Sequence, residues 1–301
     1  MKVEETSEPV GARPLLKWVG GKGWAVPLLG DAIHNYLVEH QAQYVEPFLG
    51  GAAMAGYIGW HDSILADAIP ELVSLYTIVR DKPAELAWVL SGYAVRGVDK
   101  EAYLGIRDLR PDCEIQKAAR MVYLNRLSFN GLWRVNKKGK FNVPYGDAGY
   151  RASVVNRRSR DAITSLFPHK GKFEHLSDAL QGASILHSDF ENTLSYVQDK
   201  PALIYVDPPY HETYDSYTAA GFTEEDQERL AESLWYAHDR GADIIFHNAN
   251  TPLIQYLYSD WMEVIPVDEK RPVAADPSSR ERAPCVIATT KSELLKKITT
   301  T

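Results

Sequence analysis

The sequence predicts an α/β fold in which an open, mostly parallel sheet is interrupted by a second, mostly helical domain. Short apolar runs recur along the chain, and each is followed by an acid or by turn residues, which is typical of buried parallel strands. Helical patterns lie between several of these runs, as they do in α/β proteins. The regular spacing breaks between about residues 70 and 154, and this break predicts the insertion.

The composition is that of a globular protein with one or two domains. The chain has 301 residues, of which 45% are hydrophobic and 24% charged, so collagen, wholesale disorder and a membrane bundle are excluded. No apolar run approaches the roughly 20 residues of a membrane span, and the acidic start lacks the apolar core of a signal peptide. The two cysteines, Cys113 and Cys285, give neither a disulfide framework nor a metal-ligand spacing. We therefore expect a cytoplasmic protein without a metal site.

Seven strands are expected, and five of them lead directly into polar residues. These five runs are Tyr44–Val45 before Glu46, Ile64–Ala66 before Asp67, Ile185–Leu186 before His187, Ala202–Val206 before Asp207, and Ile244–Phe246 before His247. Val264–Val267 and Cys285–Thr289 are expected to form two more strands, joined by a long polar loop. Open parallel sheets bind ligands at the carboxyl ends of their strands, so the residues that follow the runs are candidates for a site.

The clearest helical pattern covers Glu224–Arg240. Thr223 precedes it and Asp226 lies three residues further on, a spacing that lets these two residues cap the first turn reciprocally. Gly241 follows the pattern and is a typical stop signal. We therefore expect this helix to connect the fourth strand to the fifth.

The interrupted region contains a helix followed by a basic hairpin. A helical pattern covers Glu114–Leu127. After it, Leu132–Val135 and Lys140–Val143 flank the segment Asn136-Lys137-Lys138-Gly139, which predicts a β-hairpin with a basic tip.

This region also concentrates positive charge. Residues 120–160 contain ten Lys and Arg residues and one acid, Asp147, in a chain whose net charge is −7. A basic island in an acidic protein is typical of a surface that binds a polyanion, although a solvated charged face gives the same pattern. We expect residues 70–153 to form the inserted domain, and residues 1–69 and 154–301 to form one domain around it.

Two strand ends carry residues suited to a ligand that contains a ribose. The segment Glu46-Pro47-Phe48-Leu49-Gly50-Gly51 follows the first strand, and glycines there let the backbone approach a ligand closely and expose a helix N-terminus. A plain tight turn would give the same glycine pair. Asp67 lies 21 residues after Glu46 at the end of the next strand, a spacing suited to holding a pair of ribose hydroxyls.

A third strand end, Asp207-Pro208-Pro209-Tyr210, offers hydrogen-bond acceptors beside an aromatic ring. The two prolines stiffen the turn and remove two N–H donors. The turn therefore presents a carboxylate and carbonyl groups, which suit an amino group on a flat base. The simpler alternative is a turn that only ends a strand.

Taken together, these segments resemble the Dam-type (D12 class, α-group) DNA adenine-N6 methyltransferases. The match covers nearly the whole chain in family order, and its combination of motifs is highly specific. The matching segments are Leu16-Lys17-Trp18-Val19-Gly20-Gly21-Lys22, Glu46-Pro47-Phe48, Leu65-Ala66-Asp67, Tyr123-Leu124-Asn125-Arg126, Asn130-Gly131-Leu132, Phe141-Asn142-Val143-Pro144-Tyr145-Gly146 and Tyr205-Val206-Asp207-Pro208-Pro209-Tyr210. The resemblance implies a Rossmann-like, S-adenosylmethionine-dependent sheet with an inserted target-recognition domain.

The resemblance also implies roles for individual residues. Those expected to bind or shape the pocket for S-adenosylmethionine are Trp18, Lys22, Glu46, Pro47, Phe48, Gly50, Asp67, Asp189, Phe190 and Asp207. Those expected to act on the target base are Asp207, Pro208, Pro209 and Tyr210. The base must be an adenine flipped out of duplex DNA, since its N6 is paired and stacked inside the duplex.

The DNA contacts that the resemblance implies lie mainly in the inserted domain. The expected residues are Lys17, Arg126, Asn130, Leu132, Arg134, Asn136, Lys137, Lys138 and Pro144. Arg134 suits the O6 and N7 atoms of guanine in the major groove. Arg126 lies beside an apolar helix end, so it could instead be a buried partner in an ion pair. We expect a monomer in a bacterial or phage-infected cell, by the same resemblance.

Four departures from the family pattern affect the expected specificity. Ala52 replaces the usual second glycine of the cofactor loop, and Ile69 replaces an asparagine. Asp147-Ala148 stands where basic or aromatic residues are usual, and the loop 271–282 replaces a more conventional basic stretch. The Asp147-Ala148 pair weakens the prediction of a GATC-like site, Ala52 needs more room near the methionine moiety of the cofactor, and the replaced loop predicts a different closure on DNA.

Two other kinds of function are compatible with the sequence. An RNA or cytosine-N4 methyltransferase would use similar chemistry, although the basic hairpin fits the major groove of duplex DNA better than A-form RNA. A regulator that holds the cofactor without turnover predicts a damaged Asp-Pro-Pro-Tyr motif, and here all four residues are present.

Overall fold

The structure is a computed structural model that describes residues 8–136, 138–146, 166–197, 201–212, 221–270 and 282–299. Its centre is a seven-stranded sheet with the order β3-β2-β1-β4-β5-β7-β6. The strands are β1 (Gln43–Glu46), β2 (Ser63–Asp67), β3 (Ser184–His187), β4 (Ala202–Val206), β5 (Ala242–Ala249), β6 (Glu263–Lys270) and β7 (Arg282–Thr289). The pairs among β1 to β5 are parallel, and β7 runs antiparallel to both β5 and β6. This arrangement is consistent with a Rossmann-like methyltransferase fold.

Two details of the predicted strands are wrong. β3 is an edge strand whose side chains are exposed or half-buried, not buried, because it pairs on one side only, with β2. β5 does not end at His247 but continues to Ala249. The added residues pair with β7, as in the register of Asn248 with Val286, so the antiparallel neighbour extends the strand beyond its apolar run.

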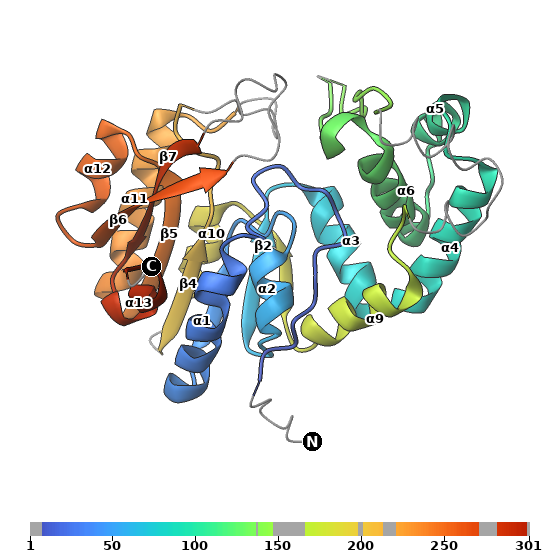
Figure 1. Cartoon of the computed structure of the whole chain (residues 1–301). Coiled ribbons are helices and arrows are strands. Elements are labelled where there is room, and N and C mark those ends of the chain that lie inside the picture. The colour runs from blue at the N-terminus through green and yellow to red at the C-terminus, as the bar shows by residue number, and fades with distance from the viewer. Residues whose placement is uncertain are drawn as a thin grey trace.

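The helices are arranged in two groups (Figure 1). Those near the sheet are α1 (Val26–His40), α2 (Ala53–Ile58), α3 (Pro70–Asp81), α9 (Lys170–Ala179), α10 (Phe190–Ser195), α11 (Glu224–Asp239), α12 (Pro252–Tyr258) and α13 (Lys296–Thr299). Those on the far side of α3 are α4 (Pro83–Arg96), α5 (Lys100–Asp108) and α6 (Glu114–Leu127), followed by the 3-10 turn η1 (Phe129–Gly131). A second 3-10 turn, η3 (Ser292–Leu295), lies near the C-terminus. The predicted capping box of α11, between Thr223 and Asp226, is confirmed.

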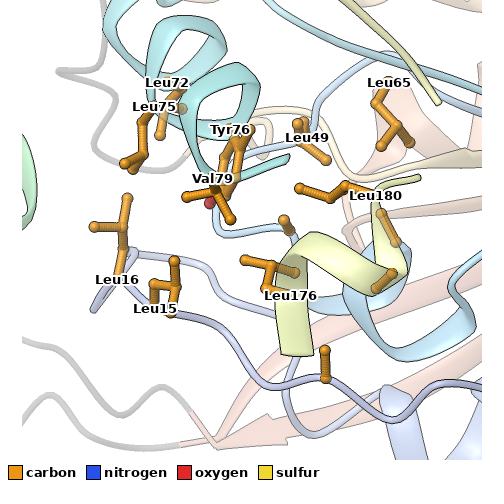
Figure 2. Packing of buried hydrophobic residues seen from close by; sticks show 14 of the residues in the cluster. Leu15, Leu16, Leu49, Leu65, Leu72, Leu75, Tyr76, Val79, Leu176 and Leu180 are labelled. Atoms are coloured by element: carbon orange, nitrogen blue, oxygen red, sulfur yellow. The ribbon is translucent and has the colours of Figure 1, made fainter. Parts of the chain in front are cut away.

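Neighbouring residues within one strand belong to two different hydrophobic clusters. Tyr44 and Leu203 belong to the cluster that includes α1, α2, α3 and α6, whereas Val45 and Ile204 belong to the cluster that includes α10 and α11. Residues next to each other in a strand point to opposite faces, so helices bury both faces of the sheet. In the first cluster, Tyr76 of α3 packs among leucines from several segments (Figure 2).

The predicted hairpin is present as a pairing but not as two regular strands. Val135 forms an isolated antiparallel bridge with Phe141, and Asn136 N–H donates to the Lys140 carbonyl at 2.9 Å. A second bridge joins Ser128 to Tyr145. The expectation of strands at Leu132–Val135 and Lys140–Val143 is therefore wrong in extent: within the described residues the arms are joined by the Val135–Phe141 bridge and by hydrogen bonds such as that from Asn142 N–H to the Arg134 carbonyl at 3.1 Å, without regular strands. Lys137, Asp147-Ala148 and the loop 271–281 lie outside the described residues.

Candidate active site

Three acidic residues meet at the edge of the sheet where the strand order reverses. β1 lies between β2 and β4, and the carboxyl end of such a strand is where open α/β sheets bind ligands. Glu46 ends β1, Asp67 ends β2, and Asp207 directly follows β4. The three strands are parallel, so their carboxyl ends lie at the same edge. The structure thus brings together three of the predicted site residues.

A buried ion pair holds the start of the Asp207–Tyr210 turn. Lys22 Nζ lies 2.7 Å from Asp207 Oδ1, and only 4% of the lysine is exposed. The same ammonium donates to the Gly20 carbonyl at 2.7 Å and lies 4.8 Å from the centre of the Tyr210 ring. Pro208 is buried, whereas Asp207 and Tyr210 are half-buried. The single ammonium group of Lys22 therefore interacts with both ends of the turn, the Asp207 carboxylate and the Tyr210 ring.

Burial and neighbouring charge keep Glu46 protonated at neutral pH. Desolvation by burial, together with the negative charges of Asp207 and Asp67, raises its pKa to about 8. Hydrogen bonds from the Tyr44 hydroxyl at 2.8 Å and from Ala55 N–H at 3.2 Å act in the opposite direction but do not cancel these effects. This edge of the sheet thus carries three neighbouring carboxyl groups of which one stays protonated, which suits a ligand that brings its own positive charge.

Asp67 orders the glycine loop that follows β1. Its Oδ2 accepts from Gly50 N–H and its Oδ1 from Ile69 N–H, each at 2.9 Å. Burial raises the pKa of this carboxyl to about 6, against the effect of those two bonds. Sequence spacing predicted a hydroxyl-binding acid here, and it missed that the same carboxylate also shapes the loop.

Trp18 lies against the two glycines of that loop. A Cβ added at Gly50 would lie 3.1 Å from Trp18 Cδ1, and one added at Gly51 would lie 3.1 Å from Trp18 Cβ. Both distances are tight, so the indole fits here because these residues have no side chain. Ala52 follows with φ 53°, a left-handed conformation that costs a non-glycine residue free energy. The departure of Ala52 from the family's glycine is thus accommodated with backbone strain.

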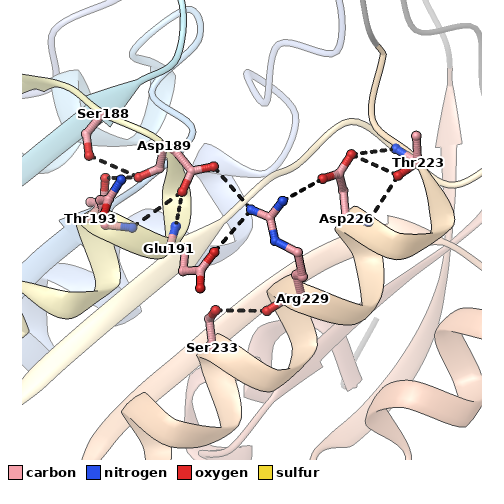
Figure 3. Close-up of polar contacts among 9 residues, drawn as sticks. Ser188, Asp189, Glu191, Thr193, Thr223, Asp226, Arg229 and Ser233 are labelled. Carbon is pink, nitrogen blue, oxygen red and sulfur yellow. Dashed lines mark hydrogen bonds and ion pairs between the residues drawn. The ribbon is translucent and has the colours of Figure 1, made fainter.

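Aromatic rings and a charged cluster lie where α10 packs against α11, next to Phe48. The ring centroids of Phe48 and Phe190 are 5.7 Å apart, and Phe222 lies 5.8 Å from Phe190. Asp189 caps α10 by accepting from the N–H groups of two following residues. Figure 3 shows Arg229 between Asp189 and two further carboxylates, and its guanidinium lies 5.0 Å from the Phe190 ring centroid.

Sequence reasoning missed Phe222 and Arg229. Both lie at or before the first turns of α11, far along the chain from Phe48 and Asp189. No local motif marks them, because packing of α11 against α10 brings them to the pocket. Pro47 is buried next to Phe48 and was predicted on family resemblance alone.

A buried asparagine joins the backbone at Lys17 to the turn that precedes the hairpin. Asn125 on α6 is fully buried; its Oδ1 accepts from Lys17 N–H at 2.8 Å, and its Nδ2 donates to the Lys17 carbonyl at 3.0 Å. The same Nδ2 donates to the Gly131 carbonyl at 2.7 Å. A Cβ at Gly131 would lie 2.6 Å from Lys17 Cβ, so the glycine permits this close approach. Asn125 lies in a matched segment, but no sequence pattern assigned it this role.

Several of the residues expected to contact DNA lie on the hairpin or directly beside it. Arg134 is half-buried, and its Nε donates to Asn142 Oδ1 at 2.9 Å. The two terminal nitrogens of its guanidinium group do not take part in this hydrogen bond. Asn136 Oδ1 accepts from Lys138 N–H at 2.9 Å and from Lys140 N–H at 3.1 Å, so this side chain organises the tip. The remaining hairpin residues differ in exposure: Asn130, Lys138 and Pro144 are exposed, and Leu132 is half-buried against the core.

Lys17 and Arg126 lie close together between the two parts of the molecule. Lys17 Nζ donates to the Arg126 carbonyl at 3.4 Å, and Arg126 Nε donates to the Leu166 carbonyl at 2.8 Å. Burial, and then the charge of Arg126, lower the pKa of Lys17. Two neighbouring cations of this kind would be stabilised by an anion, and a DNA contact by either remains a prediction.

Comparison with known proteins identifies the family. The family model for the D12 class N6 adenine-specific DNA methyltransferases matches residues 18–273. The chain belongs to this family. A type II methyltransferase of Lactococcus lactis subsp. cremoris, M1.LlaDCHI, is 32% identical over 93% of this chain and 96% of the relative. The DNA adenine methylase of retron Ec67 from Escherichia coli is 33% identical over 91% of this chain and 90% of the relative. A DNA adenine methylase of Vibrio cholerae serotype O1 is 31% identical over 82% of this chain and 84% of the relative.

The D12 assignment confirms the predicted family, fold class and adenine-specific DNA methyltransferase activity. Within the described residues, no group of three or more His, Cys, Asp or Glu side chains is arranged to hold a metal ion. No helix in the described part of the chain has both the length and the apolar character needed to cross a membrane.

The raised pKa of Glu46 predicts that this methyltransferase becomes less stable as pH rises. The folded state keeps a proton up to about pH 8, whereas an ordinary glutamate releases it near 4.5. This contribution is complete below about pH 4.5 and is lost as pH rises through about 8, with a slope of at most about 1.4 kcal/mol per pH unit.

Denaturant unfolding of the wild type and of Glu46→Gln between pH 7 and 9 measures this contribution. The substituted amide cannot titrate, so the free energy of unfolding of the variant should fall less steeply with pH. Parallel curves for the two proteins would contradict a raised pKa at Glu46.

Proposed function

We propose that this enzyme transfers the methyl group of S-adenosylmethionine to N6 of an adenine flipped out of duplex DNA. The observation that carries the proposal is the position of the Asp207–Tyr210 turn, which presents acceptors and an aromatic ring beside the acidic end of β1. Adenine N6 carries two N–H groups, and this turn offers acceptors for both. The names of the D12 family and of its relatives support DNA as the substrate, and we propose that this DNA is a duplex.

The residues at the switch point fit S-adenosylmethionine as the cofactor. The cofactor would supply an activated methyl group on a positively charged sulfur, and the carboxyl groups of Glu46, Asp67 and Asp207 lie at this edge of the sheet, where Lys22 pairs with Asp207. Asp67 suits the ribose hydroxyls, and the loop at Gly50 allows close approach of the backbone. The group assigned to the cofactor is Trp18, Lys22, Glu46, Pro47, Phe48, Gly50, Asp67, Asp189, Phe190 and Asp207.

The turn would act on the target base by orientation and fixed charge. Adenine N6 is a poor nucleophile because its lone pair is delocalised into the ring. Hydrogen bonds from its two N–H groups to the Asp207 carboxylate and the Pro208 carbonyl would favour a pyramidal nitrogen and aim the lone pair. Tyr210 would stack on the flipped ring. Most of the rate gain would come from orientation and preorganised electrostatics.

We propose that residues 70–153 form the target-recognition domain and residues 1–69 with 154–301 the catalytic domain. The group of α4, α5 and α6 beyond α3 supports a separate recognition part, whereas α3, at the start of the proposed range, packs beside β2 and β3. The DNA contacts are assigned to Lys17, Arg126, Asn130, Leu132, Arg134, Asn136, Lys137, Lys138 and Pro144. We also propose that the enzyme recognises a GATC-like site. It would act as a monomer in the cytoplasm of a bacterial or phage-infected cell.

Transfer of a labelled methyl group to matched substrates tests the class of nucleic acid. Duplex DNA, single-stranded DNA and RNA of one sequence would be incubated with labelled S-adenosylmethionine. We expect label in duplex DNA, with little in RNA. Label mainly in RNA would favour the RNA methyltransferase instead, and binding without any label would favour a regulator.

Arg134→Ala is expected to reduce the discrimination between the preferred DNA sequence and other sequences, and to change the affinity for random DNA little. Asn142 holds the arginine side chain across the hairpin, so its fork is oriented before DNA binds. A bidentate contact to guanine is worth about 1–3 kcal/mol of discrimination. Binding titrations should show that loss on the preferred duplex and little change on a scrambled one. An equal loss on both duplexes would make Arg134 a phosphate contact.

Neutralising Lys137 and Lys138 together is expected to have the opposite pattern. Lys138 is exposed near the hairpin tip, where a long ammonium side chain can reach phosphates. Phosphate contacts carry no sequence information, so binding should weaken on all duplexes. The log–log slope of affinity against salt should flatten by up to about two units. An unchanged slope would argue against phosphate contacts at the tip.

A further inference from the structure

Two buried amide side chains lie directly behind the Asp207–Tyr210 turn. Gln227 belongs to the first turns of α11, and Asn248 lies near the end of β5. Both side chains are fully buried, at 0% exposure. A buried amide is unfavourable unless its polar atoms are hydrogen-bonded, so the partners of these two residues indicate what they stabilise.

The two amides form a continuous hydrogen-bonded chain from one side of Tyr210 to the other. His211 N–H donates to Asn248 Oδ1 at 2.9 Å. Asn248 Nδ2 donates to Gln227 Oε1 at 3.0 Å, and Gln227 Nε2 donates to the Pro209 carbonyl at 2.9 Å. A backbone N–H only donates and a carbonyl only accepts, so the two ends of the chain fix the orientation of both amides.

Contacts from several other elements support this turn. Pro208 and Pro209 have no N–H groups, so neither position can donate a backbone hydrogen bond. Lys22 contacts Asp207 and the Tyr210 ring, whereas the two amides hold Pro209 and His211. Tyr210 is therefore held between two backbone groups that are each anchored to a different element of the sheet domain.

We propose that Gln227 and Asn248 act as an amide clamp that positions Tyr210 and the acceptors of the turn for methyl transfer. Both are positioning residues, because they contact the backbone of the turn. The proposal rests on the proposed role of the turn in the reaction. The anchoring of His211, whose Nδ1 lies 2.8 Å from the Thr251 hydroxyl, extends the same support to the N-terminus of α12.

Single substitutions Gln227→Leu and Asn248→Leu test the clamp. Each keeps a side chain of similar size but leaves Pro209 or His211 without its partner. We expect kcat to fall by about 10–100-fold, because misplacement of a reacting group by about 1 Å costs that much. KM for S-adenosylmethionine should change little, because Asp67 and the glycine loop keep their contacts. Glu228→Gln, at the exposed neighbouring position on α11, is the matched control and should retain wild-type kcat.

The pH profile of kcat in Gln227→Glu distinguishes a positioning role of Gln227 from a purely structural one. A protonated glutamic acid can donate to the Pro209 carbonyl in place of the amide, whereas an ionised one puts a negative charge against that oxygen. The variant's kcat, normalised to folded enzyme and compared with the wild type, should therefore be highest at low pH and fall as the new carboxyl ionises. Glu228→Gln should follow the wild-type pH profile.

The outcomes separate the clamp from the function on which it rests. If Asp207→Ala is inactive while folded Gln227→Leu and Asn248→Leu keep wild-type kcat, the clamp is rejected and the role of the turn stands. If Asp207→Ala keeps its turnover, the role of the turn is rejected, and the clamp with it. Should a leucine variant fail to fold, the Gln227→Glu profile decides: a profile that matches the wild type rejects the clamp.

Discussion

Asp207→Ala is expected to abolish methyl transfer while leaving DNA binding largely intact. The carboxylate is the charged acceptor of the turn, and removing one preorganised group of this kind costs about 10²–10³-fold in kcat. The contacts expected to hold DNA are assigned to other residues, on the hairpin and at Lys17 and Arg126. Single-turnover methylation of a duplex substrate measures the first effect, and a binding titration on the same duplex measures the second.

The ion pair with Lys22 determines the control for this experiment. Removing Asp207 leaves a buried ammonium without its carboxylate, and breaking a buried pair commonly destabilises a protein by about 3–5 kcal/mol. Asp207→Asn keeps the shape and one acceptor oxygen, so it should be better folded but still strongly impaired. Both variants should be assayed at a temperature where circular dichroism shows the folded state. Near-normal turnover in folded Asp207→Ala would contradict the mechanism.

Asp67→Ala is expected to weaken the binding of S-adenosylmethionine more than any other change in the cofactor pocket. The loss should equal roughly one to two charge-assisted hydrogen bonds, each worth about 1.5–3 kcal/mol. Part of the loss would come from the glycine loop, because Asp67 accepts from Gly50 N–H and Ile69 N–H at the same edge. Calorimetric titration with the cofactor measures the affinity.

Two variants separate these contributions. Asp178→Ala removes an exposed carboxyl on α9 and should bind the cofactor as the wild type does. Asp67→Asn keeps the size of the side chain but loses its charge, so an affinity between those of the wild type and Asp67→Ala is expected. Unchanged affinity in Asp67→Ala would reject the assignment of this residue to the cofactor.

The positions of the acidic site residues could be predicted because they follow from strand geometry. Glu46, Asp67 and Asp207 each follow a short apolar run, and parallel strands place their carboxyl ends at one edge. The capping box of α11 was equally local, since Thr223 and Asp226 are three residues apart. Both predictions were possible because each depends on residues that are close together in the sequence.

The supporting contacts could not be predicted, because they join residues that are distant in sequence. Asn125 binds Lys17 across 108 positions, and Asn248 binds His211 across 37. Buried amides have no periodic signature, and only the packed elements show which backbone groups need them. The extension of β5 to Ala249 was missed for the same reason, because it depends on pairing with β7.

The identity of the methylated base tests the central claim most directly. Purified enzyme would be incubated with S-adenosylmethionine and a panel of defined duplexes, and the nucleosides of the digested product would be identified by mass spectrometry. The account predicts N6-methyladenine, formed at one preferred sequence and absent with Asp207→Ala. N4-methylcytosine as the product, or N6-methyladenine formed equally well by Asp207→Ala, would contradict it.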